Sequence, residues 1–99
     1  MLRHVVLLTL KDEMPDGQID TIRRELMRLP DILPIQRYEM GVDAGISEGN
    51  ASLAILGEFA SEDDYQTYAA DPTHVGIIKE HILPWVSART AVQHHIDAP

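Results

Sequence analysis

The segment that decides the fold is LRHVVLLTL, residues 2–10. Alternate side chains of a β-strand point to opposite faces, so Val5 and Leu7 share one face, while the other face carries His4, Val6, Leu8 and Leu10. Aliphatic residues occupy both faces, and each face therefore needs a packing partner. His4 is the exception, because a core would favour a carbon side chain at this position.

The pattern after this strand predicts a helix and two more strands. Apolar residues recur at helical spacing between a Pro-Asp-Gly break and Pro30, at Ile19, Ile22, Leu26 and Leu29. Strands are expected over residues 35–42 and 51–59, with a loop rich in Gly and Asp at residues 43–50. The first of these two strands is less apolar, which places it nearer an edge of the sheet.

A second helical region and a last strand complete the chain. Ser61 and Asp64 resemble a capping box, so a helix is expected to begin at Ser61 and to end at Asp71-Pro72. Pro72 suits the first position of a further helical segment, which carries Val75, Ile78 and Ile82 and ends at Pro84. The last strand is expected over residues 85–96.

This order of elements predicts an α+β fold of the ferredoxin-like βαββαβ type, with a four-stranded antiparallel sheet and helices on one face. We expect a single domain over residues 1–99. Strands 2–10 and 51–59 are apolar on both faces, so the uncovered face would expose a larger apolar patch than soluble monomers carry. The sequence therefore predicts a homodimer in which two sheets face each other and close a barrel-like core.

Composition narrows the range of partners. The chain has 16 acidic and 8 basic residues and a net charge of -8, which would repel nucleic acid and anionic membranes. It has no cysteine, so disulfides, thiolate nucleophiles and zinc–sulfur sites are excluded. The longest apolar run is too short for a membrane span or a signal peptide, and a cytoplasmic location is expected.

Several segments together resemble the Dabb family, the stress-responsive dimeric A/B barrel domains. They are residues 2–7 (LRHVVL), 41–43 (GVD), 59–61 (FAS) and above all 68–74 (YAADPTH), in which a tyrosine is followed by Pro and then by His two residues later. The resemblance implies a ferredoxin-like protomer and a homodimeric barrel. The family includes plant stress-associated proteins and a plant polyketide cyclase that closes a ring by an aldol reaction without cofactor or metal.

In that cyclase the residues corresponding to Tyr68 and His74 serve the reaction, and the one corresponding to His4 lines the pocket. A further pocket histidine of the cyclase corresponds to Leu53, which argues against the same reaction on the same substrate. Aldol chemistry needs a base and a hydrogen-bond donor in a dry pocket. We expect His74 as the base and Tyr68 as the donor, with His4 as a polar contact and apolar walls from Val6, Leu8 and Leu53.

Other functions remain open at this stage. His74 and Tyr68 are equally compatible with ligand contact without turnover, or with structural hydrogen bonds in a stress-response dimer. A cofactor-independent monooxygenase of the same architecture has support from the architecture alone. No cofactor and no metal are expected, and the predicted ligand is a small apolar or phenolic molecule.

Three further motifs favour structural interpretations. GISEG at residues 45–49 matches the nucleophile elbow of serine hydrolases, but it is expected between two strands rather than between a strand and a helix. His94 and His95 are adjacent in a strand, so they face opposite sides and do not chelate one metal readily. Trp85, expected at the start of the last strand, is typical of packing at a core or interface.

Overall fold

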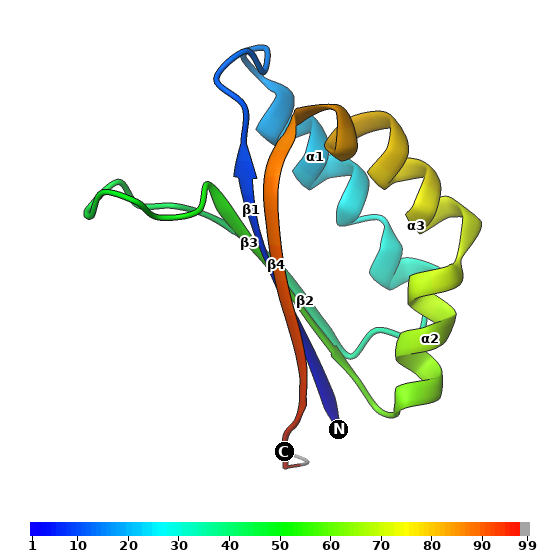
Figure 1. Cartoon of the computed structure of the whole chain (residues 1–99). Helices are drawn as coiled ribbons and strands as arrows, with labels where there is room; N and C mark the ends of the chain where they lie inside the picture. Colours follow the sequence, from blue (N-terminus) through cyan, green and yellow to red (C-terminus); the bar gives the residue numbers. More distant parts are fainter. Residues whose placement is uncertain (98–99) are drawn as a thin grey trace.

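The computed structural model describes residues 1–97 and confirms the predicted fold. Its strands are β1 (Leu2–Leu10), β2 (Arg37–Val42), β3 (Leu53–Phe59) and β4 (Val86–His95), and its α-helices are α1 (Gln18–Leu26), α2 (Glu62–Ala70) and α3 (Pro72–Ile77). All paired strands are antiparallel, in the order β2-β3-β1-β4. The helices lie together on one side of the sheet (Figure 1). None of the described helices is long and apolar enough to cross a membrane.

The helix boundaries follow the predicted signals. Ser61 caps α2, because its hydroxyl oxygen accepts a hydrogen bond of 3.1 Å from the backbone N–H of Asp64. Asp71 caps α3 in the same way, with its carboxylate accepting from the backbone N–H of His74 at 3.1 Å. Pro72 occupies the first turn of α3, where its missing N–H leaves no intrahelical bond unmade.

The connection from α3 to β4 differs from the prediction. Residues Ile78–Ile82 form a π-helical turn, and Leu83–Trp85 form a 3-10 turn. The prediction that Trp85 begins the last strand is therefore wrong. Pro84 lies within the first turn of the 3-10 segment, and the carbonyl oxygen of Trp85 accepts from the backbone N–H of Lys11 at 2.8 Å.

The face of the sheet under the helices carries the core. Leu2, His4, Val6 and Leu8 of β1 are all buried, whereas Leu7, on the opposite face, remains 42% exposed. The core continues into the helices through Ile22, Leu26 and Tyr68. This confirms that the even-numbered residues of β1 share one face, and the structure places that face under the helices.

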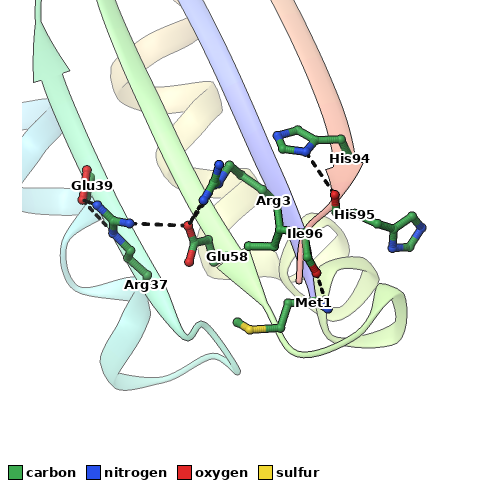
Figure 2. Close-up of polar contacts among 8 residues, drawn as sticks. All are labelled: Met1, Arg3, Arg37, Glu39, Glu58, His94, His95 and Ile96. Carbon is green, nitrogen blue, oxygen red and sulfur yellow. Dashed lines mark hydrogen bonds and ion pairs between the residues drawn. The ribbon is translucent and has the colours of Figure 1, made fainter. Parts of the chain in front are cut away.

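None of residues 1–97 forms an element that covers the other face, and one end of that face carries a charged network. The guanidinium of Arg3 donates to Glu58 at 2.9 and 3.0 Å, and Arg37 lies 3.6 Å from the same carboxylate oxygen of Glu58 while also pairing with Glu39 (Figure 2). The register extends this face with an apolar row, in which Val5 lies between Leu56 and Val92. The connection between β2 and β3 projects from the sheet on this side, away from the helices (Figure 1).

Candidate functional site

A cavity of about 260 Å³ lies between the helices and the sheet. It contains five of the six residues proposed from the sequence, namely His4, Val6, Leu8, Tyr68 and His74. The strand β1 supplies the first three because alternate residues of β1 point towards the helices. The last two come from α2 and from the start of α3. The structure thus brings together candidate residues that are far apart in the sequence.

Leu53 is the exception, and its expected place in the cavity wall is corrected. It pairs with Leu8 in the sheet, but it is 2% exposed and packed within the core, and it is not among the residues that line this cavity. It instead borders a wider hollow of about 420 Å³ at the base of the β2–β3 connection, on the side of Leu7 and Ala54. The structure therefore places Leu53 in the core and not in the wall of this cavity.

His74 is held against Tyr68 at the centre of the site. The two ring centroids are 4.0 Å apart with an interplanar angle of 30°. The Asp71 cap fixes the backbone of His74. The imidazole Nδ1 is buried and has no hydrogen-bond partner among residues 1–97. Buried polar atoms are nearly always paired, so the unpaired Nδ1 of His74 needs an explanation, and a catalytic role of the imidazole is one.

The surroundings keep His74 neutral at physiological pH. Burial lowers the pKa of its imidazole. The backbone carbonyls of Ala69 and Tyr68 lie close enough to the ring to offset part of that effect, as does the carboxylate of Asp71, although neither carbonyl meets the geometry of a hydrogen bond to Nδ1. A neutral imidazole has a free lone pair on one nitrogen and can accept a proton.

His4 is also neutral, but unlike His74 it is paired. Burial, the Arg89 cation and His74 lower the pKa of His4 to about 4. The side-chain amide of Gln93 donates to Nδ1 of His4 at 2.7 Å, which places the proton of the neutral ring on Nε2. The ring of His4 lies 5.0 Å from that of Tyr65. His4 therefore has a structural partner and also one N–H group for other contacts.

Tyr38 was not among the residues proposed from the sequence, and it completes the site. Its hydroxyl lies 2.8 Å from that of Tyr68, with either group able to donate. Tyr38 pairs with Gly57 across the sheet. A Cβ on Gly57 would lie 3.1 Å from the ring of Phe59, so the glycine leaves room for Phe59, and it would lie in ordinary contact with Tyr38. The alternation of Tyr38 and Met40 with the charged Arg37 and Glu39 was the available signal.

The two hydroxyls form a donor pair. Burial raises the pKa of Tyr68 to about 12 and raises that of Tyr38 further, so both remain protonated phenols. One O–H group is used in the hydrogen bond between them. The second O–H group is left to donate to a ligand oxygen. This is the arrangement needed to stabilise negative charge on a carbonyl oxygen.

Most of the rest of the wall is apolar, and Tyr65 and Arg89 are the exceptions. Leu26, Ile55, Ile78, Ile82 and Val86 line the cavity, and so does Arg89 of β4, for which no sequence pattern indicated a role. Ile78 and Ile82 belong to the π-helical turn, a feature that is frequent at functional sites.

The other motifs do not contribute to this cavity. Ser47 lies exposed in the connection between β2 and β3, away from any helix. His94 pairs with Arg3 in the register and His95 with Leu2, so they face opposite sides of the sheet. Within the described residues, no group of three or more His, Asp or Glu is placed to hold a metal ion.

Comparison with known proteins gives one family and a consistent fold. The family model of the stress responsive A/B barrel domain matches residues 2–95. A stress-response A/B barrel domain-containing protein of Arabidopsis thaliana is 28% identical over 85 residues. The matched residues cover 85% of this chain but 32% of the plant protein, so the chain spans about a third of that relative's length.

Solved structures extend the comparison. A dimeric ferredoxin-like protein from Thermobifida fusca is 27% identical, with a TM-score of 0.87 and coverage of 96% of this chain and 90% of that one. A hydroxynitrile lyase from Passiflora edulis shares the fold at 22% identity, with a TM-score of 0.84 and coverage of 99% and 94%.

Proposed function

The chain belongs to the stress-responsive A/B barrel (Dabb) domain family, and we propose that it is a homodimer that binds a small, mainly apolar carbonyl compound in each protomer and removes a proton from it. The observation that carries this proposal is the imidazole of His74, which lines the cavity and lies against the ring of Tyr68, together with the hydroxyl pair of Tyr38 and Tyr68. A cytoplasmic location, favoured by the absence of cysteine, is part of the proposal.

The homodimer follows from the uncovered face of the sheet. Leu7 is 42% exposed and Val92 is 53% exposed on this face, and the hollow of about 420 Å³ at the base of the β2–β3 connection adjoins Leu7. A second copy offers a surface of the same kind, so two copies bury both. The dimeric relative from Thermobifida fusca supports this arrangement.

The chemistry proposed for the cavity is proton removal next to a carbonyl group. The C–H bond breaks, its proton moves to the free nitrogen of neutral His74, and its electron pair forms an enolate. The enolate oxygen accepts the free O–H of the hydroxyl pair formed by Tyr38 and Tyr68. The enolate carbon then attacks a second carbonyl carbon, as in a cyclase, or takes a proton back, as in an isomerase. The imidazolium of His74 supplies the proton that completes either step.

Binding without turnover in a stress response is the second candidate. Its support is the relationship to the stress-response A/B barrel protein of Arabidopsis thaliana. In this case the cavity holds a ligand, and His74 contributes one hydrogen bond to it. The two candidates differ in whether a C–H bond of the ligand is broken.

Hydrogen exchange separates them. Acetophenone is incubated with the protein in D2O, and loss of the methyl proton signal is followed by NMR. The wild-type protein should accelerate the exchange, and His74→Asn should abolish the acceleration. His95→Asn is the matched control because His95 is exposed and lies outside the cavity. If wild-type protein binds small ketones without accelerating exchange, the catalytic proposal fails and the binding role stands.

A further inference from the structure

One cation lies at the cavity, and its position indicates the chemical class of the ligand. Arg89 lies opposite Leu8 in the register between β1 and β4, so it shares the helix side of the sheet with His4. The strand β4 is an edge strand, and Arg89 is exposed there while lining the cavity. Its guanidinium therefore lies between an apolar interior and solvent.

Within residues 1–97, the side chain of Arg89 makes no ion pair with a carboxylate and no hydrogen bond. The chain has twice as many acidic as basic residues, and Arg3, Arg28 and Arg37 are all paired with glutamates. The groups on which Arg89 acts are those of the site, because its charge lowers the pKa of both His4 and Tyr68. An unpaired guanidinium facing these two residues is available for an anion.

From this placement we infer that Arg89 binds a carboxylate on the ligand, so that the cavity takes a small aromatic or short-chain carbonyl compound with a carboxylate at one end. A guanidinium matches the planar carboxylate with two parallel N–H groups. The apolar end would lie against Val6, Leu26 and Ile55. A single cation lines the cavity, which suits one negative charge better than the two of a phosphate monoester.

The size of the cavity agrees with this class. Its 260 Å³ is far above the roughly 10–15 Å³ that one water needs by the same measure, so the cavity has room for several non-hydrogen atoms. An aromatic ring with a short acidic side chain fits that volume. This inference rests on the proposed function, because it assigns the orientation of a ligand in the same cavity.

The test compares a carboxylate with its neutral amide. Dissociation constants of 3-phenylpropanoate and 3-phenylpropanamide, and of benzoate and benzamide, are measured by NMR titration of the full chain. The wild-type protein should bind each carboxylate about tenfold more tightly than its amide, as expected for a hydrogen bond to a charged group. Arg89→Gln should remove this preference and leave amide binding unchanged, whereas Arg89→Lys should keep part of it.

Arg24→Gln is the matched control. Arg24 is an exposed arginine of α1 that does not line the cavity, so this variant removes the same charge and should retain the preference. Equal binding of carboxylate and amide by the wild-type protein would overturn the inference about Arg89 and leave the cavity as a ligand site. If Arg89→Gln still prefers the carboxylates over the amides, the inference about Arg89 is likewise overturned and the cavity remains a ligand site. If none of the four probes shifts the signals of His74 or Tyr68, both the inference and the proposed ligand site fail.

Discussion

Replacing His74 with phenylalanine should stabilise the folded protein, although His74 is the proposed base. The side chain is 7% exposed, and its Nδ1 is buried without a partner in the described part of the chain. A buried polar atom without a hydrogen bond costs about 1–3 kcal/mol. His74→Phe removes that atom and keeps an aromatic ring against Tyr68. The adjoining cavity gives the larger ring space.

The expected gain in the free energy of unfolding is about 1–2 kcal/mol, which allows for a small packing cost. For a domain of this size, each kcal/mol raises the melting temperature by about 4–8 °C. His4→Phe is the matched control. His4 is equally buried at 4% exposure, but its Nδ1 accepts the amide of Gln93 at 2.7 Å. That variant should lose about 1 kcal/mol with the hydrogen bond.

The assay is urea unfolding at about pH 8, where both imidazoles are neutral in the folded and unfolded chains. The protomer concentration is held constant, because the stability of a dimer depends on it. A stability difference of opposite sign for the two variants supports the reasoning. If His74→Phe loses as much stability as His4→Phe, then Nδ1 of His74 has a partner in the folded protein, and the reasoning from its unpaired state is refuted.

The remaining predictions concern pH, the uncovered sheet face and the hydroxyl pair. Stability should fall as the pH decreases from about 6.5 towards 4. Folding lowers the pKa of His4 from 6.5 to about 4, so on acidification the unfolded chain takes up this proton before the folded chain does. The contribution of neutral His4 to the free energy of unfolding is therefore complete above pH 6.5 and is lost as the pH falls towards 4. A urea midpoint that stays constant for wild type over this range would contradict this. Leu7→Asp should yield monomers in sedimentation velocity, because burying Leu7 of both copies is worth roughly 2 kcal/mol and a buried carboxylate opposes association. An intact dimer would show that this face is not the interface. Tyr68→Phe leaves the buried hydroxyl of Tyr38 without its partner and should lower the free energy of unfolding by about 1 kcal/mol, measured by urea unfolding; an unchanged value would mean that the pair does not form in solution.

The fold was predictable because its signals are local. The alternation over residues 2–10, the capping pair of Ser61 and Asp64, and the Pro72 helix start each depend on neighbours in the sequence, and the structure contains all three. Trp85 was misplaced because a turn and an extended start are both compatible with the residue after a proline. The tertiary contact with Lys11 decides between them.

The site was predictable only in part, because it depends on contacts between distant elements. Tyr38 reaches Tyr68 because β2 pairs with β3 in a register that sets it opposite Gly57. Leu53 has the right parity, but packing of the core covers it. The unpaired Nδ1 of His74 depends on the position of the whole α2–α3 corner, which no local pattern specifies.

The most direct measurement is an NMR titration of the histidine side chains with acetophenone. If the cavity under the helices is the ligand site, the imidazole signals of His74 and His4 should shift together and reach saturation. The signals of His94, on the uncovered face, should stay constant. A response at His94 with none at His74, or no response at His74 to acetophenone and other small ketones, would contradict the assignment of this cavity as the functional site.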